Sequence, residues 1–150
     1  MHSLRQRLNV RDESAFTLIE LLVVLIIIGV LLAIAIPSYL GFQKKAQQTA
    51  AASDVRSAIP DAEAYYSDHN SYASMTASAL QSTYDSGMKI YAAGPPEVPG
   101  IVSAIPGSGN TQAYCISAQD AGHWAHVQGP GGTVTNDTSA STDPCSGFTG

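Results

Sequence analysis

The chain has 150 residues, a formal net charge of -5 and charged side chains at only 13% of its positions. Its length leaves room for one compact domain, which excludes a large multidomain enzyme. Non-specific affinity for nucleic acids comes from clustered lysine and arginine, and no basic residue follows Lys89, so we expect no strong nucleic-acid binding.

The first long element is an apolar segment, Phe16 to Ile36, in which Glu20 is the single charged residue. A helix of these 21 residues would be about 31 Å long, which matches the hydrocarbon core of a bilayer. The chain runs on through Pro37 into more helix-forming sequence, so a permanent membrane helix fits better than a cleaved secretory signal. Three arginines before the segment and two lysines after it place the N-terminus in the cytoplasm.

Glu20 needs an explanation, because an acidic side chain in a membrane helix costs about 2.5 to 3.5 kcal/mol on insertion scales. One interpretation is that Glu20 lies near the start of the helix and extends its carboxylate to the interface. The other is that the carboxylate meets a specific positive partner inside an assembly. The residue by itself leaves both interpretations open.

The string AFTLIELLVVL, residues 15–25, resembles the processing signal of type IV prepilins and of the pseudopilins of type II secretion and competence systems. This resemblance is highly specific and covers about 25 residues. It implies that a prepilin peptidase removes a leader, residues 1–15, by cutting between Ala15 and Phe16. It also implies that the new amine of Phe16 is then methylated. The family usually has Gly before the cut, where this chain has Ala15.

The resemblance also assigns roles inside the apolar segment. Glu20 becomes the fifth mature residue, which in the family neutralises the N-terminal amine of a neighbouring subunit. Gly29 and Pro37 match the helix-weakening positions of the family. Physically, cleavage creates an ammonium group about one helical turn from Glu20, and an unpaired charge in an apolar bundle is penalised more than in water. Pairing would therefore select the register between subunits.

Residues 38–68 read as the same helix continued outside the membrane, in an exposed and amphipathic form. Pro37 and Gly29 would let it extend or melt locally, Pro60 would kink it, and His69 to Ser71 would end it. Apolar side chains recur at helical spacing through this stretch. They are Tyr39, Phe42, Ala46, Ala50, Val55, Ile59, Ala62 and Tyr66.

Residues 69–150 read as a small β-rich head, because six of the eight prolines and eleven of the thirteen glycines lie beyond residue 86. Gly94 to Asn110, with four prolines, is expected to be a long irregular connection. Gly129 to Gly132 is expected to be a tight turn. The candidate strands are Gly87 to Ala92, Ala113 to Ala118 and His123 to Gln128, with the last two joined in a hairpin through Asp120-Ala121-Gly122.

Few residues in this head suggest chemistry. His123 and His126 are three apart and point to opposite faces of a strand, so a metal site is a poor interpretation beside an ordinary hairpin with Trp124 packed inward. Gly107-Ser108-Gly109 lacks the context of a phosphate loop. Asn136-Asp137-Thr138 fits a glycosylation sequon, and residues 133–142 could carry O-linked sugars, yet a polar loop explains both. We expect no catalysis and no cofactor.

Cys115 and Cys145 lack the C-x-x-C spacing of zinc ribbons and thioredoxin-like sites, which leaves a disulfide or two free cysteines. The disulfide requires that the head leave the cytoplasm, as the membrane helix predicts. Residues beyond Gly129 have few large apolar side chains, so a covalent tie would hold them down where burial cannot. The resemblance agrees, since many of these pilins carry a C-terminal disulfide. We predict a Cys115 to Cys145 bond.

The sequence therefore predicts an α+β fold, in which a long N-terminal helix (residues 16–37 in the membrane or filament core) packs its exposed half on a small antiparallel sheet. The resemblance implies a structural subunit of a type IV pilus-like filament, with itself, a prepilin peptidase and methylase, and a membrane assembly platform as partners. Such a subunit crosses the cytoplasmic membrane once and then enters an extracellular filament. The alternatives are a pseudopilin of a secretion or DNA-uptake machine, and a membrane-anchored binding module with an uncut N-terminus and no polymer.

Overall fold

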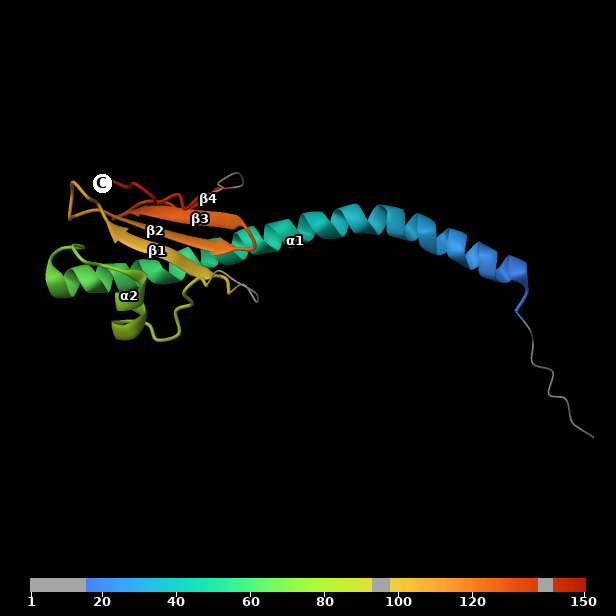
Figure 1. Cartoon of the computed structure of the whole chain (residues 1–150), viewed down its shortest axis with the longest axis horizontal. Coiled ribbons are helices and arrows are strands. Elements are labelled where there is room, and N and C mark those ends of the chain that lie inside the picture. Colours follow the sequence, from blue (N-terminus) through green and yellow to red (C-terminus); the bar gives the residue numbers. More distant parts are fainter. Residues whose placement is uncertain (1–15, 93–97, 138–141) are drawn as a thin grey trace, which may run out of the picture. The chain divides into compact units, whose positions relative to one another are not determined.

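The computed structural model describes residues 16–92, 98–137 and 142–150 (Figure 1). Its contacts divide the chain into two compact units, residues 1–40 and 41–150. One helix and a four-stranded antiparallel sheet dominate the described part, which confirms the predicted α+β fold. In chain order the elements are α1 (Leu18–His69), α2 (Ala77–Thr83), β1 (Gly100–Pro106), β2 (Tyr114–Asp120), β3 (His123–Gly129) and β4 (Thr135–Asp137).

In the first unit, α1 begins at Leu18 and every residue from Phe16 to Leu40 is exposed. Among the described helices, α1 is long and apolar enough to cross a bilayer, and none of its most apolar stretch is buried within the chain. The α-helix continues without interruption through Gly29, Pro37 and Pro60. The local extension of the helix at Gly29 and Pro37 stays a prediction, as does the kink at Pro60.

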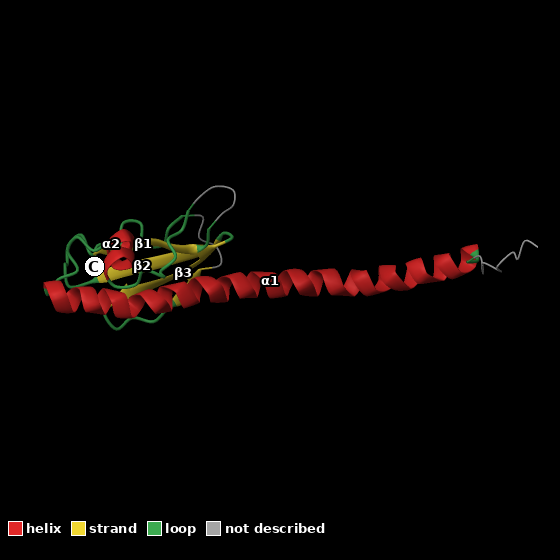
Figure 2. Cartoon of the chain, turned by 90° about the horizontal axis from the view of Figure 1, so that it is seen from below, coloured by secondary structure: helices red, strands yellow, loops and turns green. Residues whose placement is uncertain are grey.

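In the second unit, the last part of α1 lies along one face of the sheet (Figure 2). Only Val55 and Ala62 of the predicted apolar stripe are fully buried, whereas Tyr39 and Phe42 are 62% and 72% exposed. Alanines make up most of the contact face, because small side chains let a sheet approach a helix closely. The buried residues of α1 are Ala51, Ala52, Val55, Ala58, Ala62 and Tyr65.

The sheet has the strand order β1-β2-β3-β4, and each neighbouring pair is antiparallel. β2 and β3 form the predicted hairpin, and Ala121 and Gly122 in its turn have φ values of 45° and 80°. The core against α1 is filled by side chains that alternate along β2 and β3, and by two on β1, where a register shift between Ile101 and Ser103 interrupts the alternation. They are Ile101 and Ala104 on β1, Tyr114, Ile116 and Ala118 on β2, and Ala125 and Val127 on β3.

Three parts of the head differ from the sequence prediction. The region Gly94 to Asn110 was expected to be irregular, yet β1 runs through it; residues 94–97 lie outside the described part. β1 is an edge strand with Pro106 as its last residue, a place where a missing N–H is tolerated. Gly87 to Ala92 is not a strand but forms only single bridges, at Ile90 and Ala92. The short α2 and β4 were not predicted.

A carboxylate on α1 ties the helix to the rest of the head. Glu63 accepts hydrogen bonds from the hydroxyls of Tyr72 and Tyr114, each at 3.1 Å. Burial, and then the negative charge of Glu63, raises the pKa of the Tyr114 hydroxyl above its usual value. Tyr114 therefore stays a neutral donor, and it connects the centre of the sheet to the helix.

Candidate functional site

The first turn of α1 contains a capping box, built from Thr17 and Glu20. The backbone N–H of Thr17 donates to Glu20 Oε2 at 2.9 Å, and the Thr17 hydroxyl donates to the same oxygen at 2.7 Å. In return, the backbone N–H of Glu20 donates to Thr17 Oγ1 at 3.3 Å. The spacing T-x-x-E is the known signature of this arrangement, so the role of Thr17 as a capping residue can be recognised from the sequence.

The carboxylate of Glu20 stands at the edge of an apolar surface. Phe16, Ile19, Val23 and Val24 line a hollow of about 410 Å³ together with Glu20. Both hydrogen bonds from Thr17 end on Oε2, so the capping box itself does not use Oε1. Thr17 thus holds the carboxylate while the Glu20 side chain stays exposed.

The processing position lies at the border of what the structure describes. Phe16 is described and 85% exposed, whereas Ala15 and the rest of the leader, residues 1–15, lie outside the described part. The assignments of cleavage at Ala15 and methylation at Phe16 therefore stay predictions. Gly29 and Pro37 lie within α1 and are both exposed.

We expect Thr17→Val to weaken the first turn of α1 by about 1 kcal/mol, because the β-branched shape is kept and the capping hydroxyl is lost. Hydrogen exchange of the Glu20 amide, measured on the full chain in detergent, would then be about fivefold faster than in the wild type. Thr17→Ser keeps the hydroxyl and should exchange at the wild-type rate. Equal exchange in Thr17→Val and Thr17→Ser would contradict the capping role.

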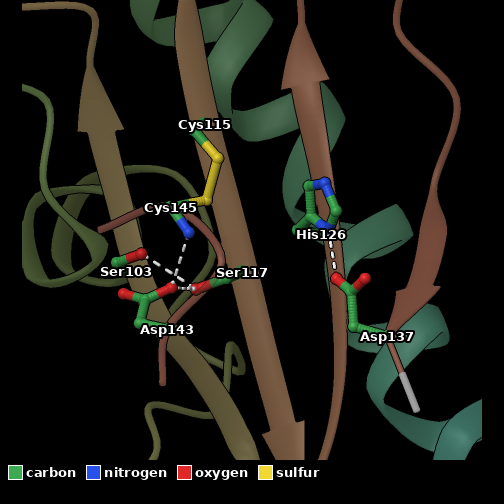
Figure 3. The surroundings of a disulfide bond; sticks show 7 residues. All are labelled: Ser103, Cys115, Ser117, His126, Asp137, Asp143 and Cys145. Carbon is green, nitrogen blue, oxygen red and sulfur yellow. Dashed lines mark hydrogen bonds and ion pairs between the residues drawn. A yellow bond between two sulfur atoms is a disulfide. The ribbon is translucent and has the colours of Figure 1, made fainter. Parts of the chain in front are cut away.

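The second place of interest is the outer face of the sheet, away from α1. Cys115 on β2 and Cys145 near the C-terminus form the predicted disulfide (Figure 3), with a Cα–Cα distance of 5.6 Å. Both cysteines are fully buried. Trp124 is also buried, at 7% exposure, but it shares this outer face rather than the core against α1.

The two histidines of β3 lie on opposite faces, as their spacing predicts. His126 faces outward, and its Nδ1 lies 2.6 Å from Asp137 Oδ2, which links β3 to β4. His123 has a buried Nδ1 that finds no hydrogen-bond partner among the described residues. Asn136 of the sequon is exposed on β4, while Thr138 lies outside the described part.

The glycine-rich segment at residues 107–109 forms turn contacts. Gly107 donates its backbone N–H to Ala113 O at 2.9 Å, and Gly109 donates to Thr149 O at 3.0 Å. The N–H groups of Gly107 and Gly109 are thus bonded to carbonyl groups of the same chain. The sequence also did not identify Ser117, Asp143 and the pair of His126 with Asp137, because such contacts depend on how distant segments meet.

Known proteins share both the N-terminal segment and a larger part of the chain. The family described as the prokaryotic N-terminal methylation motif matches residues 10–36. The chain is 33% identical over 112 residues to the type IV wide pilus major component PilA4 of Thermus thermophilus, covering 75% of this chain and 77% of that protein. It is 38% identical over 66 residues to the type IV major pilin protein PilA of Myxococcus xanthus, covering 44% of this chain and 30% of that protein.

A secretion protein is similar as well. The type II secretion system core protein G of Aeromonas hydrophila is 37% identical over 62 residues, which cover 41% of this chain and 43% of that protein. No solved structure matches the chain with significant similarity.

Proposed function

Since the chain belongs to the family of type IV pilins and type II secretion pseudopilins, we propose that it is the repeating structural subunit of an extracellular type IV pilus. The observation that carries this proposal is the extent of the match with the wide pilus component, which spans 112 residues. Since α1 ends at His69, a match of that length includes part of the head as well as the helix. The match with core protein G spans 62 residues and is short enough to fit within the leader and α1.

In this proposal the subunit first waits in the cytoplasmic membrane, with the apolar part of α1 across the bilayer and the head outside. Prepilin peptidase cuts between Ala15 and Phe16, and the amine of Phe16 is methylated. An assembly platform in the membrane then adds the subunit to the filament. The exposed apolar side chains of residues 16–36 become the packed core of the filament, where contacts between helices replace the contacts that these side chains make with lipid. The role is structural rather than catalytic.

Glu20 is assigned to the docking step. The ammonium group of an incoming neighbour would be placed beside Oε1, where the capping box leaves room for it. Neither charge remains unpaired in the apolar core if the register is correct, and a wrong register leaves both unpaired. Glu20 therefore couples assembly to processing, because the positive amine exists only after the leader is removed.

A pseudopilin of a type II secretion system is the second candidate, and the similarity to core protein G favours it. Both candidates share processing and assembly by helix bundling. They differ in whether the filament extends outward from the cell surface.

The test is mass spectrometry and electron microscopy of filaments sheared from cells that produce this chain. We expect fibres whose subunit begins at N-methylated Phe16, with a formal side-chain charge that changes from -5 to -6, because the leader carries three arginines and two acids. Sheared material without the subunit, together with a loss of protein secretion on deletion, would favour the pseudopilin. An intact leader on surface-exposed protein would contradict both candidates.

A further inference from the structure

The C-terminal segment, residues 142–150, has little apolar surface with which to hold itself on the sheet. Cys145 is fully buried and Phe148 is half-buried, while most of the remaining residues are exposed. Ordering one residue costs about 1 to 2 kcal/mol of backbone entropy, so the burial of two side chains does not suffice for the whole segment. Polar contacts and the disulfide must supply the rest.

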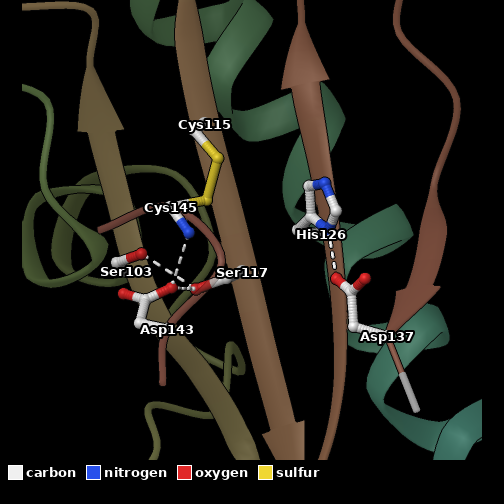
Figure 4. A network of polar contacts seen from close by, with 7 residues as sticks. All are labelled: Ser103, Cys115, Ser117, His126, Asp137, Asp143 and Cys145. Atoms are coloured by element: carbon white, nitrogen blue, oxygen red, sulfur yellow. Dashed lines mark hydrogen bonds and ion pairs between the residues drawn. A yellow bond between two sulfur atoms is a disulfide. The ribbon is translucent and has the colours of Figure 1, made fainter. Parts of the chain in front are cut away.

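Asp143 makes the polar contacts between this segment and the outer face of the sheet (Figure 4). Its Oδ1 accepts a hydrogen bond from Ser117 Oγ at 2.6 Å and another from the backbone N–H of Cys145 at 3.0 Å. Ser117 is fully buried on β2, and its Oγ also lies 2.8 Å from Ser103 Oγ on β1. One carboxylate oxygen thus joins the segment directly to β2, and Ser117 extends the network to β1.

These contacts are arranged around the two sulfur atoms. Ser117 lies two residues after Cys115, so the two side chains share one face of β2. Asp143 lies two residues before Cys145 and bonds to its backbone, and the N–H of Ser146 donates to the Asp143 carbonyl at 3.0 Å. The hydrogen bonds of Asp143 therefore lie next to the disulfide and involve both of the segments that it joins.

We propose that Asp143 is a positioning residue that favours the placement of Cys145 against Cys115 in the reduced chain and so raises the effective concentration of one thiol at the other. The contact is favoured because it gives the buried Ser117 hydroxyl a charged acceptor, and hydrogen bonds to a charged group are the stronger ones. An external disulfide then oxidises the pair. Two thiols and one molecule of glutathione disulfide give the Cys115–Cys145 bond and two molecules of glutathione, which carry away two electrons and two protons. This inference concerns the head alone and holds for either kind of filament.

Equilibrium with glutathione tests the proposal, since it measures the effective concentration of one thiol at the other. The full chain in detergent is incubated at a fixed ratio of oxidised to reduced glutathione, quenched by alkylation and weighed. We expect Asp143→Ala to lower the effective concentration about tenfold, because two hydrogen bonds that favour the docked segment are lost. Asp143→Asn keeps an acceptor oxygen and should recover part of this loss.

Two control variants separate positioning from general stability. Ser103→Ala removes a contact between strands but leaves Asp143 bonded to Ser117, so its effective concentration should stay within about twofold of the wild type. Val127→Ala opens a cavity in the core against α1 and should lower the free energy of unfolding without changing the native thiol equilibrium.

An effective concentration for Asp143→Ala within about twofold of the wild type would overturn the proposal. So would an equal fall in Val127→Ala, since the effect would then follow stability alone. If Asp143→Ala does not fold, Ser117→Ala decides the question. A fall of at least about threefold in this variant supports the proposal, and an unchanged value overturns it.

Discussion

Replacement of Glu20 by alanine is expected to abolish filament assembly while leaving membrane insertion intact. The alanine leaves the amine of the neighbouring subunit without its partner in an apolar core, and breaking a buried ion pair costs about 3 to 5 kcal/mol. Each addition step would then be disfavoured more than a hundredfold, since about 1.4 kcal/mol is tenfold. Insertion itself should become easier, because the variant has no acid to place in the bilayer.

Glu20→Gln is the matched control, because Gln also serves at this position of a capping box. It keeps the hydrogen bonds with Thr17 and removes the charge, so it should fail to assemble as Glu20→Ala does. The measurement is the amount of sheared filament from a strain that lacks the wild-type subunit, beside the amount of subunit in the membrane fraction. Normal filaments from Glu20→Gln would show that capping matters and that charge pairing does not.

Removal of the disulfide by the double change Cys115→Ala and Cys145→Ala is expected to lower the free energy of unfolding by roughly 3 to 4 kcal/mol. In the chain-entropy model this is the value for a closed loop of about 31 residues, formed by two cysteines 30 positions apart. Trp124 is the single tryptophan of the chain and is buried in the head, so its fluorescence follows unfolding in urea.

Reductant provides the control for this prediction. It should destabilise the wild type by an amount close to that of the double variant and leave the double variant unaffected. Alkylation of sheared wild-type protein without reductant should add no mass, because both sulfurs are joined. Two alkyl groups on native exported protein would show that the disulfide does not form in the cell. Equal stability of the wild type with and without reductant would show that the disulfide does not stabilise the head.

The parts of the fold that follow from local chemistry were predictable. The apolar run from Phe16 to Ile36 and the helical spacing after it require a long helix. Alternating side chains around Ala121 and Gly122 require a hairpin. The disulfide followed from the cysteine count and from a head expected to lie outside the cytoplasm. β1 was missed because its flanking prolines suggested a loop, and only its place at the sheet edge makes them acceptable.

The sequence by itself determined the family and the capping contacts at the start of α1, because both lie in one continuous stretch where neighbours along the chain are neighbours in space. Thr17 and Glu20 meet through a single helical turn, and no distant residue is needed to place them. The tertiary structure decided which face of α1 is buried. The buried face is rich in alanine, which suits the close approach of a sheet, and the sequence of the helix does not say where that sheet lies. It also decided that Asp143 meets Ser117, because residues 26 positions apart come together only when the C-terminal segment folds back over β2.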